Sequence, residues 1–515
     1  MQGKINKNLY RAILIISFIA ANALILFGIS SVFGFLNTGA DRSTMLHTEI
    51  KSSRMYLPRI TWDTTHYDGR PMKQQSLEEI ERDYLNAWYV KNLALETNKK
   101  YGVEDYYTDS ARVNIYNAIA YNEEHKLHFT NTTTNHEPEL LFYSADGQLV
   151  VFNDHQVIEY SEGREIEDIL YRSTDTSSYK IMMLLEDGFW RIRHLRKQRR
   201  TKIGKAVGKP KNWEIKGNKI FYKGSVYPIE GINYYPKDTP WDMFGEGFDS
   251  EIIAEDLQII AEAGLNTIRI FLQYEDFGKA AVQEEKLVKL QKTLDAAQAN
   301  NLKVVVTLFD FYGDYSVLDW TLTHEHARQI VSRFKDHEAI IAWDLKNEPD
   351  LDFKSRGEEE VLNWLKFLIP QIRRTDPNHL LTVGWSSPEA AHHLKDELDL
   401  VSFHYYKDKE QFLEIYTELQ EAINKPLVLQ EFGISSYNGL LNPLGYNEAD
   451  QAEYHNYMQD FFSKDQVSFM SWTLYDFDEV PTSVVGRLPW RKARQKKFGF
   501  LDTEGHRKPS FKYIN

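Results

Sequence analysis

Residues 340–349 read IIAWDLKNEP, a run of apolar side chains that passes directly into an Asn-Glu-Pro sequence. Such a run is typical of a strand that is buried on both faces, with polar residues following at its carboxyl end. Residues 426–433, PLVLQEFG, repeat the arrangement, with Glu431 shortly before a glycine. Glu348 and Glu431 are therefore both expected at the edge of a sheet where parallel strands carry their functional groups.

The chain from Trp213 onward alternates between strand-like and helix-like segments. The expected strands are Tyr227–Ile232, Thr267–Phe271, Lys303–Leu308, Ile340–Leu345, Leu380–Gly384, Leu398–Phe403, Leu427–Leu429 and Ser468–Trp472. Between them, helical periodicity predicts helices at Ser250–Ala263, Glu284–Asn300, His324–Phe334, Glu358–Arg373, Lys409–Ile423 and Asp450–Phe462. Eight repeats in about 300 residues predict a (β/α)8 TIM barrel, an α/β fold. A doubly wound open sheet is the alternative, although no Gly-rich phosphate loop follows the first strand.

The carboxyl ends of these strands share a polar, aromatic and acidic character. In chain order they carry Asn233-Tyr234-Tyr235, Arg269, Asp310, Asn347-Glu348, Trp385, His404-Tyr405-Tyr406, Glu431 and Trp472. No group of histidines and acids has metal-ligand spacing, so we expect neither a metal nor another cofactor. Two carboxyl groups at strand ends are the minimum apparatus for breaking a glycosidic bond.

The order of these residues resembles a known family. Residues 213–515 are similar to the clan A glycoside hydrolases, and most resemble glycoside hydrolase family 5, which contains cellulases and β-mannanases. That family has an Arg on the second strand, Asn-Glu-Pro after the fourth, His-x-Tyr after the sixth, Glu after the seventh and Trp on the eighth. The matching residues here are Arg269, Asn347-Glu348-Pro349, His404-Tyr405-Tyr406, Glu431 and Trp472.

The resemblance implies retaining hydrolysis through a covalent glycosyl-enzyme. Glu431 is then the nucleophile, and Glu348 protonates the leaving oxygen and afterwards activates water. This requires the two carboxyl groups to lie about 5–5.5 Å apart. Arg269 is expected to keep Glu431 ionised, whereas Glu348 needs apolar surroundings or a nearby negative charge to hold its proton.

The resemblance also assigns substrate contacts. Asn347 is expected to hold the sugar 2-hydroxyl, and Trp472 to form the floor on which the ring stacks. His404 and Tyr406 are expected to line the cleavage subsite, with Tyr406 touching the nucleophile.

Some of these residues have structural alternatives. Arg269 could be the ion-pair partner of Asp344, and Trp472 could belong to the barrel core. Asp310 and Asp344 are expected to be structural. The remaining candidates are sugar platforms or ordinary loop packing: Tyr234, Tyr235, Trp241, Trp320, Trp385 and Tyr475.

Residues 41–200 predict a separate small α+β domain. Residues 75–99 have helical spacing, and the segments that follow read as an antiparallel sheet with Asp-Gly turns. The pattern resembles the nuclear-transport-factor-2-like (SnoaL-like) superfamily. We assign this domain no catalysis, and a basic linker is expected at residues 201–212.

Residues 12–35 are uncharged and apolar apart from one Asn and three Ser, which is long enough to cross a bilayer. Lys4, Lys7 and Arg11 precede the run, so the positive-inside bias places residues 1–40 as a cytoplasmic tip and anchor. The rest of the chain is then periplasmic or extracellular. A cleaved signal peptide is the competing interpretation.

The composition constrains the partners. The formal net charge is -14, which argues against a nucleic-acid partner, and the absence of cysteine excludes disulfides and thiolate metal sites. The leading hypothesis is a membrane-anchored retaining endo-β-glycosidase acting on β-mannan, β-glucan or an exopolysaccharide. The alternatives are a transglycosylase, a non-catalytic scaffold subunit of a polysaccharide synthesis or export complex, and a polysaccharide-binding sensor.

Overall fold

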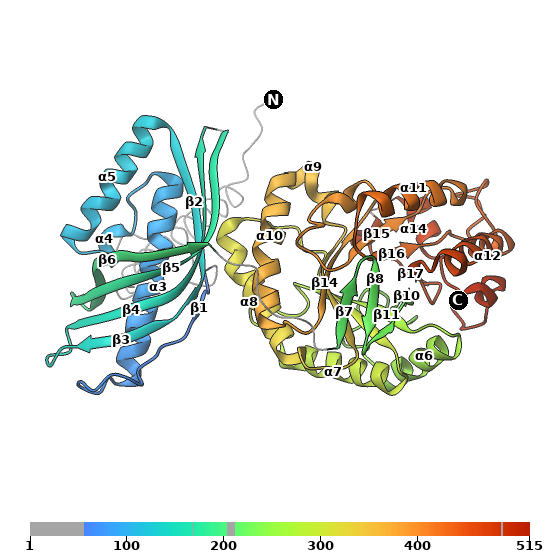
Figure 1. Ribbon diagram of the computed structural model, residues 1–515, viewed down its shortest axis with the longest axis horizontal. Coiled ribbons are helices and arrows are strands. Elements are labelled where there is room, and N and C mark those ends of the chain that lie inside the picture. Colours follow the sequence, from blue (N-terminus) through green and yellow to red (C-terminus); the bar gives the residue numbers. More distant parts are fainter. Residues whose placement is uncertain (1–55, 167, 203–211, 486–487) are drawn as a thin grey trace, which may run out of the picture.

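The computed structural model describes residues 56–166, 168–202, 212–485 and 488–515. These residues form two lobes that lie side by side (Figure 1). Within those ranges, no helix combines the length and the apolar character that a bilayer crossing needs. The segment expected to be an anchor, residues 12–35, lies outside the described residues.

The first lobe is α+β, as expected. Its helices are α3 (Gln74–Thr97), α4 (Val103–Tyr106) and α5 (Asp109–His125). They cover one face of a curved sheet with the strand order β1-β2-β4-β5-β6, and β3 pairs with β4. These strands are β1 (Arg59–Ile60), β2 (Leu127–His136), β3 (Pro138–Tyr143), β4 (Leu149–Glu165), β5 (Asp168–Glu186) and β6 (Phe189–Lys202). The resemblance of this lobe to the nuclear-transport-factor-2-like superfamily stays a prediction.

Two features of the first lobe differ from the expectation. Strand β6 runs to Lys202, so the linker interpretation is wrong for residues 201–202. Helix α5 was not expected, and its apolar stripe is narrow, because only Ile115, Ile119 and Asn122 are buried along it. A helix with so few buried positions has a weak sequence signal.

The second lobe is a closed parallel barrel of eight strands, which confirms the (β/α)8 prediction. The strands are β10 (Glu230–Asn233), β11 (Thr267–Gln273), β12 (Lys303–Asp310), β13 (Ile340–Asn347), β14 (Leu380–Trp385), β15 (Val401–Tyr405), β16 (Leu427–Phe432) and β17 (Ser468–Trp472). Strand β10 begins later than expected, and Pro228, which lacks a backbone N–H, lies just before it.

Helices surround the barrel as predicted, with one exception. The long helices are α6 (Ser250–Glu262), α7 (Glu284–Ala299), α8 (Trp320–Phe334), α10 (Glu358–Thr375), α11 (Lys409–Ala422) and α12 (Glu448–Asp465). Between β14 and β15 the connection holds only a short 3-10 helix, η3 (Ala390–His392).

A small antiparallel sheet covers the amino-terminal end of the barrel. It consists of β7 (Trp213–Lys216), β8 (Lys219–Tyr222) and β9 (Ser225–Val226). Trp213 and Ile220 from this sheet form one buried cluster with Val305, Ile341 and Val428 from the barrel strands. Because this end is closed by packing, a site for a large substrate is left to the carboxyl ends of the strands.

The two lobes share an interface in which β2, β4 and β5 face α8 and α10. Tyr160 packs on Trp320 with ring centroids 4.4 Å apart, and the Thr134 hydroxyl donates to Gln371 at 2.8 Å. Arg172 pairs with Glu359 of α10 at 2.7 Å. The buried cluster of the barrel extends to Tyr160, so apolar packing as well as surface charge joins the lobes.

Candidate active site

Six of the seven residues predicted for the site lie at the carboxyl ends of barrel strands or directly after them, and Arg269 lies earlier in its strand. Arg269 is on β11, Asn347 ends β13 and Glu348 follows it, and Glu431 is on β16. The other three are His404 on β15, Tyr406 after it, and Trp472 at the end of β17.

Arg269 connects most of these groups. Its side chain is fully buried, and Nη1 lies 2.6 Å from Oε1 of Glu431. Nη2 lies 2.7 Å from Oδ2 of Asp344 and donates to Oδ1 of Asn347 at 2.8 Å. Arg269 is therefore both the ion-pair partner of Asp344 and the cation beside Glu431. Burying this cation is compensated by two carboxylates.

The arrangement around Arg269 depends on an irregularity in β13. In a regular strand, Asp344 and Asn347 would point to opposite faces, because side chains alternate. The pairing of β13 with β14 shifts register between these two residues, so both side chains reach the same guanidinium. A β-bulge of this kind re-aims side chains next to functional sites.

Glu431 is held from two sides and is 5% exposed. Besides the contact with Arg269, its Oε2 accepts a hydrogen bond from the Tyr406 hydroxyl at 2.8 Å. Burial and the charge of Glu431 raise the pKa of Tyr406, so this hydroxyl keeps its proton and remains a donor. The carboxylate therefore has a fixed orientation and a positive charge beside it.

Glu348 faces Glu431 across a short gap. One carboxylate oxygen from each lies within 4.8 Å of the other, and Nδ1 of His404 lies 2.9 Å from Oε1 of Glu348. The Glu348 side chain is 28% exposed, so it can be reached from outside. Its backbone has φ 48° and ψ 50°, a left-handed conformation that is uncommon for a residue other than glycine and often marks a functional position.

The protonation of Glu348 differs from the expectation. Burial acts to raise the pKa of Glu348, but the hydrogen bond to His404 and the charges of His404, Arg269 and Lys346 outweigh it and lower the pKa. Burial lowers the pKa of His404, and the two carboxylates more than offset this, so its pKa is raised. The contact therefore favours the ionised form of Glu348 and the protonated form of His404.

By distance alone, Glu348, His404 and Glu431 could also hold a cation. Arg269 already supplies a positive charge 2.6 Å from Glu431, and His404 is hydrogen-bonded to Glu348. This arrangement suits acid–base chemistry better than metal binding.

Trp472 lies among other aromatic side chains and is only 6% exposed. Its ring is 6.1 Å from that of Phe271, 6.3 Å from Trp241 and 6.4 Å from Tyr235. Trp320 and Trp385 are almost fully buried, and Trp320 packs against the first lobe, so neither offers a face to a sugar.

Two further charged residues lie close to Glu348 and Glu431, and sequence reasoning did not assign them to the site. Asp310, at the end of β12, is 4% exposed; burial and the charges of Glu431 and Glu348 raise its pKa to about 7, against the opposing effect of Lys346 and Arg269. Lys346 is 4% exposed and lies 3.5 Å from Asp352. The position of Asp310 at a strand end was the sequence signal that could have assigned it to the site. No sequence signal assigned Lys346, because the direction of its side chain depends on the irregular part of β13.

Comparison with known proteins agrees with this geometry. The family model described as Cellulase (glycosyl hydrolase family 5) matches residues 232–478, which run from within β10 to just beyond β17. The barrel is a glycoside hydrolase domain, and over this range it is similar to family 5. The site described above therefore occupies the part of this glycoside hydrolase domain that the family model covers.

Individual relatives of the glycoside hydrolase domain are distant. Mannan endo-1,4-beta-mannosidase F of Aspergillus clavatus is 23% identical over 195 residues, 29% of this chain and 44% of that protein. Human beta-glucuronidase is 23% identical over 303 residues, 54% of this chain and 43% of that protein. The chain thus spans less than half the length of both relatives. Among solved structures, exo-beta-1,4-mannosidase Op5Man5 from Opitutaceae bacterium strain TAV5 is 19% identical with a TM-score of 0.47, covering 56% of this chain and 59% of that one.

Proposed function

We propose that this chain is a retaining endo-β-glycosidase that cleaves a β-linked polysaccharide by double displacement. The observation that supports it best is the pair Glu348 and Glu431, whose nearest oxygens lie within 4.8 Å. This separation suits direct attack on the sugar, since inverting enzymes place their carboxyl groups about 6.5–9.5 Å apart to make room for a water.

In the first step, Glu431 attacks the anomeric carbon while Glu348 delivers a proton to the leaving oxygen. Arg269 and Tyr406 hold the attacking carboxylate in place. The proton that Glu348 delivers must be supplied from the pair that it forms with His404. In the second step, Glu348 removes a proton from water, and the water releases the sugar from Glu431.

The substrate class follows from the relatives. They include mannosidases and a β-glucuronidase, so β-mannan is the first candidate, with β-glucan and acidic exopolysaccharides next. Asn347 is proposed to contact the sugar 2-hydroxyl, and Trp472 to lie under the ring. His404 is proposed to line the same subsite.

The test is release of reducing ends by residues 41–515 from β-mannan, β-glucan and exopolysaccharide panels. Glu431→Gln is expected to lower the rate roughly 10³-fold or more. Glu348→Gln should retain far more activity on aryl glycosides with a good leaving group, since such a group departs without a proton. Glu389→Gln, which changes an exposed carboxylate paired with Lys407, is the matched control and should act like the wild type.

Absence of release from every panel, with substrate bound, would contradict hydrolysis. Products longer than the substrate would instead indicate transglycosylation. A scaffold subunit of a polysaccharide synthesis or export complex is the remaining alternative, and it predicts that the cellular phenotype survives in Glu431→Gln.

We also propose that residues 12–35 anchor the chain in the cytoplasmic membrane, with the barrel outside. The support is the length and apolarity of that segment and the basic residues before it. The full chain should remain in the membrane fraction after an alkaline wash, and added protease should reach the barrel in intact spheroplasts. Release by the alkaline wash would contradict the anchor.

A further inference from the structure

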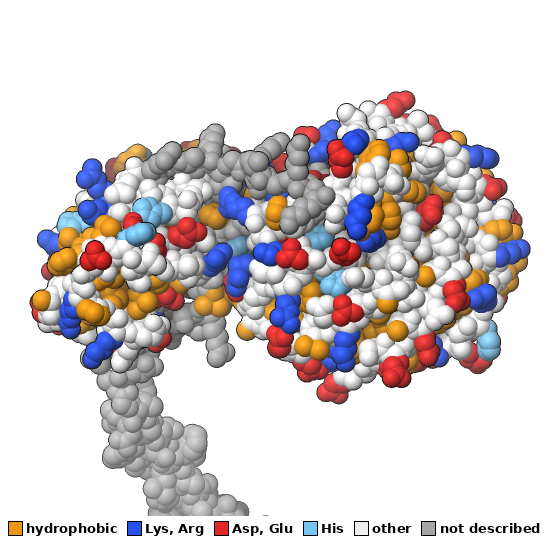
Figure 2. Space-filling model, turned by 60° about the horizontal axis from the view of Figure 1, so that its bottom comes forward, with side chains coloured by type: hydrophobic (Ala, Val, Ile, Leu, Met, Phe, Trp, Pro, Cys, Tyr) orange, Lys and Arg blue, Asp and Glu red, His pale blue; other side chains and the backbone are white. Residues whose placement is uncertain are grey.

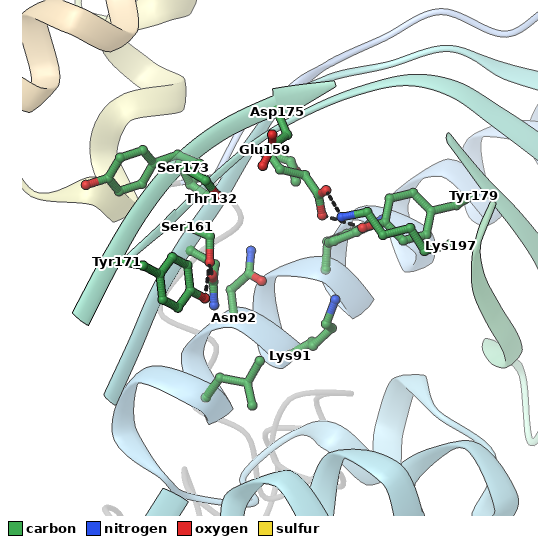
Figure 3. Close-up of a pocket in the computed structure, with 15 residues that line it drawn as sticks. Lys91, Asn92, Thr132, Glu159, Ser161, Tyr171, Ser173, Asp175, Tyr179 and Lys197 are labelled. Carbon is green, nitrogen blue, oxygen red and sulfur yellow. Dashed lines mark hydrogen bonds and ion pairs between the residues drawn. The ribbon is translucent and has the colours of Figure 1, made fainter. Parts of the chain in front are cut away.

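The first lobe contains a cavity of about 490 Å³ between α3 and the inner face of the curved sheet (Figure 3). Helix α3 contributes Lys91 and Asn92, and the strands contribute hydroxyl and carboxyl groups. The volume is in the range of pockets that hold small molecules. A second cavity of about 630 Å³ shares the lining residues Lys91, Leu95, Tyr179 and Lys197.

One polar group in this cavity lacks the partner that buried groups normally have. Thr132 is 1% exposed, lines the cavity, and its Oγ1 has no hydrogen-bond partner among the described residues. Buried donors and acceptors are almost always paired, so the Thr132 hydroxyl is suited to a bound polar molecule. Asn92 is 3% exposed, and its amide points from α3 toward the cavity, where it can contact the same molecule.

Lys91 places a positive charge at the wall of the cavity. Its ammonium nitrogen lies 4.3 Å from the ring centroid of Trp88 and forms no ion pair within the described part of the chain. The nearest carboxylate on the cavity wall, Glu159, already accepts from Lys197 at 2.6 Å and from Ser177 at 2.6 Å. Burial lowers the pKa of Lys91 against the opposing effect of Glu159, so the ammonium group would gain from closer compensation of its charge. An anionic group in the cavity would provide it.

The rest of the lining suits a molecule with several hydroxyl groups. Ser161 contacts the Tyr171 hydroxyl at 3.0 Å, and Ser173 and Asp175 extend the row of oxygen atoms along β5. Carboxylates and hydroxyls accept hydrogen bonds from sugar hydroxyls. The lining holds two lysines, Lys91 and Lys197, and two carboxylates, Glu159 and Asp175, so its formal charges balance. Lys197 is paired with Glu159, whereas Lys91 has no ion pair among the described residues, so a ligand carboxylate fits beside Lys91.

We propose that this cavity binds a uronic-acid saccharide unit, with the sugar carboxylate at Lys91 and the ring hydroxyls at Asn92, Thr132 and Ser173. The choice of a saccharide rests on the proposed function of the barrel. The first lobe then holds an acidic glycan next to the glycoside hydrolase domain and is a second sugar site in the same chain.

The test is saturation-transfer NMR on the full chain in the Glu431→Gln background, with D-glucuronate as the probe and D-glucose as its neutral counterpart. Glucuronate should bind, and glucose at least tenfold more weakly. Lys91→Met keeps a chain of similar length over Trp88 and should weaken glucuronate binding at least tenfold. Thr132→Val, which keeps the shape and removes the hydroxyl, should weaken it severalfold. Lys180→Met, at an exposed lysine on β5, is the matched control and should change nothing.

Glucuronate binding that survives both Lys91→Met and Thr132→Val, with unchanged thermal unfolding, would overturn the proposal by placing the sugar elsewhere. Absence of glucuronate binding, or equal binding of the two sugars, would also overturn it. Hydrolysis is measured separately on Lys91→Met in a chain that retains Glu431. An inactive barrel with Lys91-dependent binding contradicts only the proposed function, whereas an active barrel without such binding contradicts only this inference.

Discussion

Arg269 and His404 each contact one of the two carboxylates. Arg269 lies 2.6 Å from Glu431, and His404 lies 2.9 Å from Glu348. The first contact places a positive charge beside the proposed nucleophile. The second lowers the pKa of Glu348, although a general acid needs its proton when the sugar is bound. In the proposed mechanism, His404 therefore tunes the pH range in which Glu348 can donate.

Replacing His404 by Gln should shift the pH profile of kcat/KM. The basic limb reports loss of the proton from Glu348, and His404 lowers the pKa of that group. Without the imidazolium, the pKa of Glu348 rises, so the basic limb should move to higher pH while the maximal rate falls. A basic limb at the wild-type pH would show that another group supplies the proton.

Asp310 should make stability depend on pH. Its pKa is raised from 3.8 to about 7 in the folded chain, so the folded state holds a proton that the unfolded state releases. The contribution of Asp310 therefore falls as pH rises from about 4 to about 7. The free energy of unfolding of the wild type and of Asp310→Asn is measured with denaturant at several pH values. Relative to the variant, the wild type should become less stable as the pH rises through this window. A constant difference would contradict the raised pKa.

Strand β13 carries Asp344 and Asn347 into one site through its bulge, and Glu348 follows directly after the strand. Asp344 is fully buried; its Oδ2 accepts from Arg269 and Thr307, and its Oδ1 accepts from the backbone N–H of Gly384. Asp344→Asn removes one partner of a buried pair and should lower the free energy of unfolding by about 3–5 kcal/mol. Glu389→Gln, at an exposed pair, should change it by less than about 1 kcal/mol. Equal small effects would show that Arg269 is held by other groups.

The sequence predicted the order of strands and helices well, because buried apolar runs and helical periodicity are local. It also predicted the strands on which Arg269 and Glu431 lie and the strand that Glu348 follows. It could not predict the bulge in β13 or the left-handed conformation of Glu348, since both depend on pairing with β14. For the same reason it did not predict the lowered pKa of Glu348, which requires the distance to His404.

At the scale of the molecule, the two lobes are joined through aromatic packing. Trp320 of α8 packs against both Phe367, at 4.7 Å, and Tyr160 of the first lobe, at 4.4 Å. On the face in Figure 2, acidic and basic side chains are interspersed over the barrel lobe, so no broad single-sign patch is visible there. Strand β4 reaches both the barrel and the cavity, because Tyr160 packs on Trp320 and lines the cavity together with Glu159 and Ser161.

Tyr160→Ser should weaken the interface between the lobes. The change leaves a cavity beside Trp320 and should lower the free energy of unfolding by about 2–4 kcal/mol. The effect should appear in the barrel as increased hydrogen exchange at α8 and α10. An increase in hydrogen exchange confined to the first lobe would show that the lobes are energetically independent.

The central claim is that Glu431 forms a covalent bond with the sugar while Glu348 supplies the proton. The reagents are 2-deoxy-2-fluoro-β-D-mannosyl fluoride and the corresponding glucosyl fluoride. The fluorine at carbon 2 slows both chemical steps, whereas the fluoride leaving group speeds the first step. The covalent intermediate therefore accumulates. Mass spectrometry of the digested protein should find one fluorosugar on the peptide that contains Glu431, and none in Glu431→Gln. A hydrolysed substrate with inverted anomeric configuration and no labelled peptide would contradict the account.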